Sequence, residues 1–342
     1  MNYIFCEQPF KYFEINDSGE VKVCCDKWCN NFSIGNIFDS DFEEIFNGEK
    51  LQELIMQFTS QKFNICNLDI CPSYEFLKKE DYEYKFEKYA KITQKTIRLN
   101  YDSNCNLNCI FCGNQKLRQE PEKYLQINKF IYKILPYLNE QGWIISLNGV
   151  GEVFTSKCHL ELIKHIVSNY PNIKFSLITN GILFTEKMIQ TLNIEDRLET
   201  VEVSVHAYNE KTYKCLVKNG NFKILKNNLR YISRLKKDGK IKNFYMNFVV
   251  TSVNYKEMSK FIDWAKSLNA FVMFLPLLAI NDISSDVYNQ LNITSPKHPQ
   301  YNDFVAKMQN QIFKQDKVSI PKIYLELKRI RTKNFIQKLF ER

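Results

Sequence analysis

The sequence lacks long apolar runs, and it shows no signal-peptide pattern at its start. Its longest nearly continuous apolar stretch, residues 270–280, is far shorter than the roughly 20 residues that a membrane-spanning helix requires. Residues 1–13 do not combine a basic start with an apolar core, as a secretory signal peptide would. We therefore expect a protein without a transmembrane segment, located in the reducing cytoplasm.

Low-complexity tracts and repeats of solenoid length are absent as well. Of the 342 residues, 44% are hydrophobic and 14% are aromatic, which is enough apolar material for packed cores in two or three domains. The net charge of +9 is spread along the chain, so solubility explains it as well as an acidic partner would. We expect a globular protein that binds no membrane, and we do not expect nucleic acid as its partner.

Cysteine, in contrast, is abundant, and the 11 cysteines fall into two groups. One group lies within residues 6–71 and the other within residues 105–112, while Cys158 and Cys215 stand apart. The two groups predict two modules with a boundary near residue 90. The two isolated cysteines are typical of small buried hydrophobic side chains.

After residue 95, short β-rich runs alternate with longer amphipathic stretches. The predicted strands cover 96–101, 143–148, 173–178, 200–205, 243–250 and 270–275. The predicted helices cover 127–138, 160–168, 186–192, 222–235 and 255–267. This alternation predicts an α/β fold with a parallel sheet and crossover helices. In such folds the chemistry lies at the carboxyl ends of the strands.

Three further segments have recognisable patterns. Residues 74–95, rich in Glu, Lys and Tyr, predict an exposed helix or linker. Residues 301–313 predict an amphipathic helix, and residues 321–342 predict a basic amphipathic one. A basic amphipathic tail docks on a membrane or a nucleic acid in some proteins, but we expect this one to cover the edge of its own domain.

Unusual short sequences follow the first three predicted strands. Cys105, Cys109 and Cys112 come after the first strand, with three and then two residues between them. Cysteine thiolates are the usual ligands of iron–sulfur clusters, and a cubane cluster normally binds one thiolate at each iron. A loop that supplies three therefore leaves one iron open to another molecule. Gly149-Val150-Gly151-Glu152 and Thr179-Asn180-Gly181 follow the second and third strands.

The same cysteines also fit a structural zinc site completed by a distant Cys or His. Zinc ribbons and fingers usually carry paired Cys-x2-Cys or His knuckles, whereas this run has a three-residue gap and then a two-residue gap. We favour the cluster on this ground. Phe111, inside the last gap, fits either an ordinary core position or a shield between the cluster and solvent.

The spacing Cys105-x3-Cys109-x2-Cys112 after the first strand, with Gly-x-Gly-Glu after the second, resembles the radical S-adenosylmethionine (radical SAM) superfamily over about residues 95–277. The resemblance implies a (β/α)6 partial TIM barrel. It also implies that the three cysteines bind a [4Fe-4S] cluster whose fourth iron is chelated by S-adenosylmethionine (AdoMet). In such enzymes the reduced cluster cleaves AdoMet into methionine and a 5′-deoxyadenosyl radical.

The resemblance also assigns contacts with AdoMet. Gly149 and Gly151 let the backbone approach the ligand closely, and Glu152 accepts a hydrogen bond from its ammonium group. A tight turn with a solvated carboxylate is the alternative for this segment. Asn180 either contacts AdoMet or shapes only its own loop. Ser204 faces the ribose.

At several positions the chain departs from the family pattern. Val153 stands where proline commonly follows the glutamate, and His206 stands where an aspartate often follows the fourth strand. His206 fits either a structural role or a contact with substrate or AdoMet. Val217 occupies the place of an arginine that often approaches the AdoMet carboxylate, with Lys218 beside it as a substitute.

The N-terminal module resembles a second known unit, the SPASM-type auxiliary-cluster domain. The resemblance rests on Cys6, Gly19-x4-Cys24, Ile34-Gly35-Asn36-Ile37 and Cys66-x4-Cys71. This domain normally follows the radical SAM core, whereas here it precedes the core and has too few cysteines for two clusters. We expect one auxiliary [4Fe-4S] cluster, and a four-cysteine zinc site is the alternative. The implied ligands are Cys6, Cys24, Cys66 and Cys71, with Cys25 and Cys29 as alternates.

These features predict three domains: an auxiliary-cluster domain with a linker helix at 1–90, a radical SAM core at 91–280 and a C-terminal helical extension at 281–342. We expect an oxidoreductase whose adenosyl radical abstracts a hydrogen atom from a peptide or protein, with an electron donor such as flavodoxin or ferredoxin. A sugar or another small molecule is the second substrate class. A metal-sensing or nucleic-acid-binding protein that does not turn over AdoMet is the alternative from another class.

Overall fold

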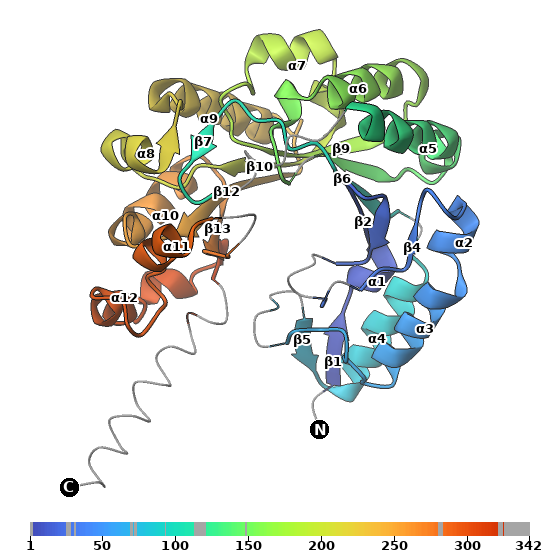
Figure 1. Ribbon diagram of the computed structural model, residues 1–342, viewed down its shortest axis with the longest axis horizontal. Coiled ribbons are helices and arrows are strands. Elements are labelled where there is room, and N and C mark those ends of the chain that lie inside the picture. The colour runs from blue at the N-terminus through green and yellow to red at the C-terminus, as the bar shows by residue number, and fades with distance from the viewer. Residues whose placement is uncertain are drawn as a thin grey trace, which may run out of the picture. The chain divides into compact units, whose positions relative to one another are not determined.

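The chain divides into two compact units (Figure 1). The first unit comprises residues 1–104, 118–178 and 187–199, and the second comprises residues 105–117, 179–186 and 200–342. The computed structural model describes residues 3–24, 29–30, 32–68, 71, 74–92, 94–112, 121–147, 149–279, 283–320 and 324.

The first unit contains the first three parallel strands of the predicted α/β alternation. β6 (Thr96–Asn100) pairs with β8 (Ile144–Leu147), and β8 pairs with β9 (Lys174–Thr179). The crossovers are α5 (Pro121–Glu140) and α6 (Lys157–Asn169). In β6 every second residue is buried, as the two-residue repeat of a strand requires. The predicted elements are confirmed here, although α5 begins earlier than expected.

The second unit contains the other three parallel strands. These are β10 (Leu198–Ser204), β12 (Asn243–Val250) and β13 (Phe271–Pro276), with the short parallel strand β14 (Val318–Ser319) beside β13. The helices of this unit include α9 (Phe222–Lys237), α10 (Met258–Ser267) and α11 (Ser285–Leu291). Helix α7 (Glu186–Leu192), which precedes β10, belongs to the first unit except for its first residue. Helix α9 begins after Asn221, whose side chain accepts a hydrogen bond from the N–H of Ile224. The predicted α/β class, with six parallel strands alternating with helices, is confirmed.

The N-terminal region contributes strands to the sheet of the first unit. β2 (Tyr12–Asn16) pairs in parallel with β6, so that Phe13 lies opposite Ile97 and Ile15 opposite Leu99. β3 (Glu20–Lys22) and β4 (Gly35–Asn36) continue the sheet as antiparallel strands. Sequence patterns did not predict these strands. The cysteine-rich region is therefore joined to the core strand β6 by backbone hydrogen bonds as well as by the chain.

The other described residues of this region form a small two-stranded sheet and four helices. β1 (Tyr3–Cys6) pairs with β5 (Tyr74–Leu77) in antiparallel fashion. The helices are α1 (Gln8–Lys11), α2 (Phe42–Phe46), α3 (Glu49–Thr59) and α4 (Lys79–Ala90). The segment predicted as an exposed helix or linker contains α4, none of whose residues is fully buried. Its first residues instead form β5.

Other elements differ from the sequence-based expectation. Sequence patterns did not predict α8 (Glu210–Leu216), β7 (Asn108–Cys109) or β11 (Val217–Lys218). The helix expected at 301–313 is instead α12 (Tyr301–Lys307) followed by a 3-10 turn at Gln311–Lys314, which the Asn310 side chain caps. The tail expected at 321–342 lies outside the described residues except for position 324. No helix in the described ranges combines the length and apolar character needed to cross a bilayer.

Phe13 of β2 lies at the centre of an aromatic cluster. Its side chain is fully buried. Its ring stacks on Trp143 with the ring centroids 5.9 Å apart, and it packs edge to face with Phe46 at a centroid distance of 4.7 Å. Large buried rings contribute much of the hydrophobic stabilisation of a core. The cluster therefore anchors the N-terminal strands to the strands that follow residue 95.

We expect Phe13→Ala to lower the free energy of unfolding by about 3 to 5 kcal/mol, because it removes a buried ring and leaves a cavity. Phe76→Ala is the matched control: that side chain is 58% exposed, and its loss should cost less than about 0.5 kcal/mol. Urea unfolding of the metal-free protein, followed by circular dichroism, measures both values. Equal effects of the two substitutions would contradict the anchoring role of Phe13.

Candidate functional site

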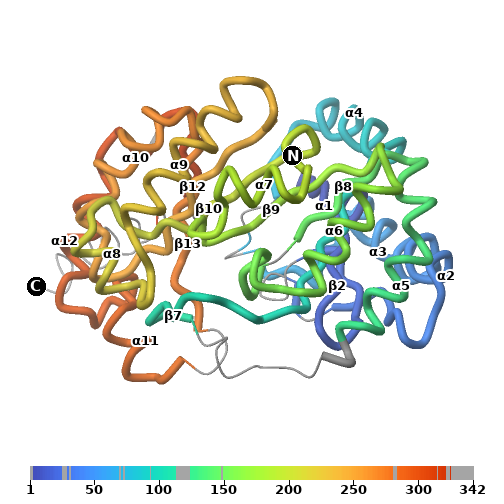
Figure 2. Tube along the Cα trace, turned by 90° about the horizontal axis from the view of Figure 1, so that it is seen from above, coloured from blue at the N-terminus to red at the C-terminus, as the bar shows by residue number. Residues whose placement is uncertain are grey.

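The loop that carries Cys105, Cys109 and Cys112 is fixed by strand pairing within the second unit. β7 pairs with β11 in antiparallel fashion, which sets Cys109 opposite Val217. Figure 2 labels β7 and also α8, whose last residue directly precedes β11. Beside this pair the N–H of Ile110 donates to the carbonyl of Leu216 at 2.9 Å. The middle of the cysteine loop is therefore held against the segment that follows α8.

The three thiols of this loop interact electrostatically. Burial raises the pKa of Cys109 far above its usual range, and Cys112 and Cys105 raise it further. Cys105 and Cys112 are exposed, and the Cys105 sulfur accepts a hydrogen bond from the N–H of Leu107 at 3.4 Å. Within the described part of the chain, no three His, Cys, Asp or Glu side chains already surround a metal position. These thiols would therefore have to turn toward a common centre to bind a cluster.

Asn180, at the end of β9, reaches the same loop. Its amide nitrogen donates to Oδ1 of Asn106 at 2.8 Å and contacts the Cys105 sulfur at 3.7 Å. Its side-chain oxygen accepts from the N–H of Ile182 at 3.0 Å. Gly181, between them, has a φ of +78°, which glycine adopts without strain. Asn180 thus shapes its own turn and also contacts the cysteine loop.

In the first unit, the Gly-x-Gly-Glu segment packs on the residues that directly precede Cys105. The N–H of Glu152 donates to the carbonyl of Asn104 at 2.8 Å. A Cβ added at Gly151 would lie 2.5 Å from the carbonyl oxygen of Asp102 and 2.6 Å from that of Asn104, so only glycine fits there. At Gly149 an added Cβ would meet only a side chain, that of Asn100, at 2.9 Å.

The carboxylate of Glu152 is fully buried. Its Oε1 accepts from the N–H of Phe154 at 3.4 Å, at the start of a short 3-10 turn. Val153, which stands where the family commonly has proline, is fully buried in this turn. A carboxylate accepts strong hydrogen bonds from ammonium groups, which is the contact that the family resemblance assigns to Glu152.

His206 is buried in the second unit and lies against the cysteine loop. Its ring meets the ring of Phe111 edge to face at 5.0 Å. Nδ1 accepts from the N–H of Val249 at 3.1 Å, and the carbonyl accepts from the Asn254 side chain at 2.8 Å. Burial lowers the pKa of His206 to about 4, so the ring is neutral at pH 7. The backbone φ of +63° is held by these contacts.

The other residues singled out in this unit lie near the same elements. Ser204 ends β10, where it pairs with Asn247. Val217 is buried, and the ammonium of the exposed Lys218 donates to the carbonyl of Lys214 at 3.2 Å. Position 217 therefore supports the cysteine loop through its backbone, while the Lys218 side chain folds onto α8.

Tyr213 of α8 is a buried side chain that the sequence patterns did not single out. Its side chain is fully buried, and its hydroxyl has no hydrogen-bond partner among the described residues. Burial raises the pKa of Tyr213 well above its usual range, and Cys109 and Cys105 raise it further. A tyrosine on the buried face of a helix resembles an ordinary core residue, so the sequence carries no signal for this position.

The N-terminal cysteines form a second interacting group, in the first unit. Burial, with smaller contributions from Cys71 and Cys66, raises the pKa of Cys6 to about 12. Burial, with smaller contributions from Cys71 and Cys29, also raises the pKa of Cys66 to about 12. The sulfur of Cys29 contacts the carbonyl of Cys24 at 3.7 Å. Cys25, an alternate in the sequence analysis, lies outside the described residues.

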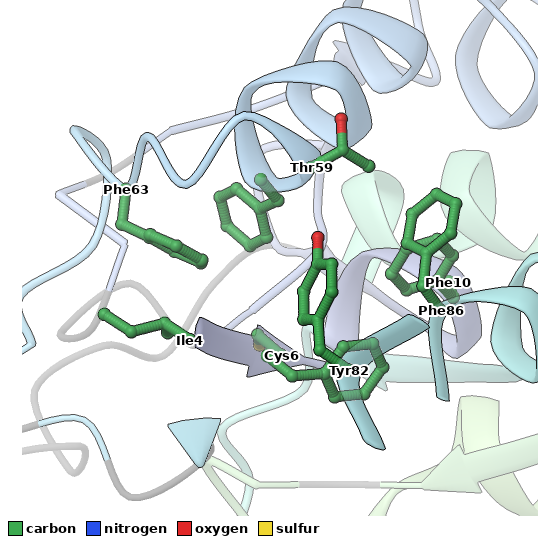
Figure 3. A pocket seen from close by; sticks show the side chains of 9 residues that line it. Ile4, Cys6, Phe10, Thr59, Phe63, Tyr82 and Phe86 are labelled. Atoms are coloured by element: carbon green, nitrogen blue, oxygen red, sulfur yellow. The ribbon is translucent and has the colours of Figure 1, made fainter. Parts of the chain in front are cut away.

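A small apolar hollow lies beside Cys6 (Figure 3). Most of its wall is aromatic, and the labelled rings of Tyr82 and Phe86 come from α4. Its lining consists of Ile4, Phe5, Cys6, Phe10, Phe58, Thr59, Phe63, Tyr82 and Phe86. Such a wall keeps water from one side of the Cys6 thiol, and burial is one of the factors that set the potential of an iron–sulfur cluster.

Comparison with family models gives two matches. Residues 99–265 match the radical SAM superfamily, and residues 6–72 match the SPASM iron–sulfur cluster-binding domain. A probable GTP 3′,8-cyclase of Methanococcus aeolicus is 26% identical over 204 residues, which are 58% of this chain and 64% of the relative. A GTP 3′,8-cyclase of Desulforamulus reducens is 24% identical over 189 residues, which are 54% and 56%. The chain thus spans less than two thirds of these curated relatives.

Two solved structures resemble parts of the chain. SuiB of Streptococcus suis, bound to the precursor peptide SuiA, has a TM-score of 0.41 and 17% identity, covering 81% of this chain and 64% of that one. The AdoMet-bound structure of anSMEcpe has a TM-score of 0.46 and 22% identity, covering 66% of this chain and 64% of that one.

The radical SAM match implies a [4Fe-4S] cluster that binds AdoMet. The SPASM match implies auxiliary iron–sulfur cluster binding by the N-terminal domain. The residues present fit these groups. Thiolates are the ligands that iron–sulfur clusters take, and each of the two groups of cysteines is close enough to interact electrostatically. The buried carboxylate of Glu152 fits the ammonium group of AdoMet.

We expect Gly151→Ala to weaken iron retention by roughly tenfold, because the new Cβ pushes the backbone that leads into Cys105. Gly149→Ala is the matched control, since its Cβ meets the Asn100 side chain, which can turn away. Iron analysis after anaerobic reconstitution and mild chelation compares the two variants. Equal retention by both would contradict the proposed backbone contact.

The buried histidines should make stability depend on pH. The folded pKa values of His206 and His159 are about 4, below the 6.5 of an unperturbed histidine. The unfolded chain therefore binds more protons, and stability is lost as the pH falls from about 6.5 to 4, by up to about 3 kcal/mol per histidine.

His206→Asn should remove about half of this loss, because asparagine tolerates the positive φ but does not titrate. Urea unfolding of the metal-free protein at pH 7.5 and pH 4.5 measures this loss of stability. His165→Asn, at an exposed position, serves as the control and should leave the difference between the two pH values unchanged. If His206→Asn and the wild type lose the same free energy of unfolding between pH 7.5 and pH 4.5, His206 does not contribute to the pH dependence of stability.

Proposed function

We propose a reaction for this chain on the premise that it is a member of the radical SAM superfamily with an N-terminal SPASM iron–sulfur cluster-binding domain. The reaction is reductive cleavage of AdoMet followed by hydrogen abstraction from a substrate carbon. When bound, the cluster and AdoMet supply the 5′-deoxyadenosyl radical. The observation that carries the proposal is the fixed loop in which Cys105, Cys109 and Cys112 interact.

Five side chains have direct roles in the proposed reaction. Cys105, Cys109 and Cys112 hold the catalytic cluster. The buried carboxylate of Glu152 accepts a hydrogen bond from the AdoMet amino group, and Asn180 positions the cysteine loop through Asn106.

Backbone shape and packing complete the site. Gly149 and Gly151 leave room for close approach of the backbone, and Ser204 faces the ribose. Phe111, packed on the neutral ring of His206, keeps water from the cluster. Exclusion of water favours radical chemistry because it prevents side reactions.

The N-terminal domain would hold one auxiliary [4Fe-4S] cluster. We assign Cys6, Cys66 and Cys71 as ligands, supported by their mutual electrostatic interaction. Cys24 is the fourth ligand, with Cys29 as the alternate. Such a cluster would accept an electron or position the substrate. The proposed domain limits are 1–90, 91–280 and 281–342.

A peptide or protein is the proposed substrate, because enzymes that resemble this chain in carrying a SPASM domain commonly modify peptides or mature partner enzymes. A cytoplasmic one-electron donor such as flavodoxin or ferredoxin would reduce the cluster. The relatives named GTP 3′,8-cyclase favour a second candidate, a nucleotide or another small molecule, over part of the chain.

We expect the anaerobically reconstituted and reduced protein to form 5′-deoxyadenosine from AdoMet. The Cys105→Ala, Cys109→Ala, Cys112→Ala variant should give only background, because the cluster loses its three thiolates. Cys215, which was expected to be buried, is in fact exposed. Cys215→Ala removes this cysteine, which lies outside both groups, so it is the control and should keep wild-type product. Chromatography and mass spectrometry quantify the product.

Two further results decide the class of protein and substrate. A colourless protein that holds zinc in place of iron would overturn the radical mechanism. Deuterium transfer into 5′-deoxyadenosine from a labelled peptide supports the first substrate class, whereas transfer from labelled GTP supports the second.

A further inference from the structure

The hydroxyl of Tyr213 is a buried polar group that the proposed roles do not use. The side chain is 0% exposed, and no hydrogen-bond partner for the hydroxyl exists among the residues that the structure describes. A buried donor left without an acceptor lowers stability, so native proteins rarely keep one without a reason. An acceptor that arrives with a bound group is one such reason.

The backbone ties Tyr213 to the cysteine loop through a short chain of hydrogen bonds. The N–H of Val217 donates to the carbonyl of Tyr213 at the end of α8. Val217 in turn pairs with Cys109 across β11 and β7, and the N–H of Ile110 donates to Leu216. The tyrosine and the cysteine therefore share one hydrogen-bonded framework within the second unit.

The tyrosine ring is also held in place on its other side. The ring of Phe222 lies 5.2 Å from it, and a Cβ added at Gly220 would come within 2.6 Å of the hydroxyl oxygen. The absence of a side chain at Gly220 lets the backbone close over this oxygen. The hydroxyl is confined where Cys109 and Cys105 act on it electrostatically. A phenol hydroxyl can donate a hydrogen bond to a thiolate sulfur.

We propose that the Tyr213 hydroxyl donates a hydrogen bond to the Cys109 sulfur when the cluster is bound, and so raises the reduction potential of the catalytic cluster. This inference rests on the proposed function. Hydrogen bonds to the sulfurs are among the factors that set cluster potentials. Reduction by one electron adds negative charge to the cluster and its thiolates, so a donor stabilises the reduced form more than the oxidised form. No bond is formed or broken, and an external one-electron donor supplies the electron.

Tyr213→Phe tests this proposal because it removes only the hydroxyl. Tyr255→Phe is the matched control, since Tyr255 is also buried in the second unit but its hydroxyl donates to Asp303. Both variants and the wild type are reconstituted anaerobically and checked for iron content and circular dichroism. A dithionite titration without AdoMet, followed by electron paramagnetic resonance, then gives the potential of the catalytic cluster. The titration is done in a Cys66→Ala, Cys71→Ala background, which removes the auxiliary cluster. The remaining signal then belongs to the catalytic cluster.

We expect Tyr213→Phe to disfavour reduction about tenfold, which for one electron is about 59 mV to more negative potential. Tyr255→Phe should match the wild type. Electron–nuclear double resonance of the reduced cluster should show an exchangeable proton in the wild type that Tyr213→Phe lacks. An unchanged potential and an unchanged proton signal, with full iron content in both proteins, would overturn this proposal alone. Failure of the wild type to bind iron would overturn the proposed function together with it.

Discussion

The antiparallel pairing of β7 with β11 is the contact on which the proposed site depends. The cysteine loop gains a fixed backbone at Cys109 because the chain after α8 supplies a partner strand at Val217. A two-residue strand pair is weak on its own. Here it is stabilised by packing, since Leu216 and Val217 are almost completely buried. The geometry of the loop thus follows from the core of the second unit, before any iron binds.

Long, strongly patterned elements were predictable from the sequence. The strand expected at 243–250 and the helix expected at 186–192 have the same bounds in the structure. The strands β2 and β3 were not predictable, because they are short and their partners lie far away in the chain. Parallel pairing between residues 12–16 and 96–100 leaves no local pattern that a sequence could show. The SPASM match covers the same region without indicating that its strands extend the core sheet.

The chemistry of the candidate site was predictable where it depends on residue type and spacing. Three cysteines in a short loop indicate a cluster whatever their exact arrangement, and the family match agrees with that reading. The role of His206 was not predictable, because a histidine at a strand end fits burial and exposure equally well. Its neutral, buried state follows from contacts with Phe111, Val249 and Asn254, which only the fold brings together.

Position 217 shows how one residue changes what a segment does. An arginine in this place often approaches the AdoMet carboxylate in the family that the chain resembles. Valine is β-branched and apolar, so it suits the buried strand position that Val217 occupies opposite Cys109. A guanidinium group in that buried position would need a partner of opposite charge. The ammonium of Lys218 is already bound to the carbonyl of Lys214. This segment therefore supports the backbone of the cysteine loop. Under the proposed function, the carboxylate of AdoMet would be bound by other residues.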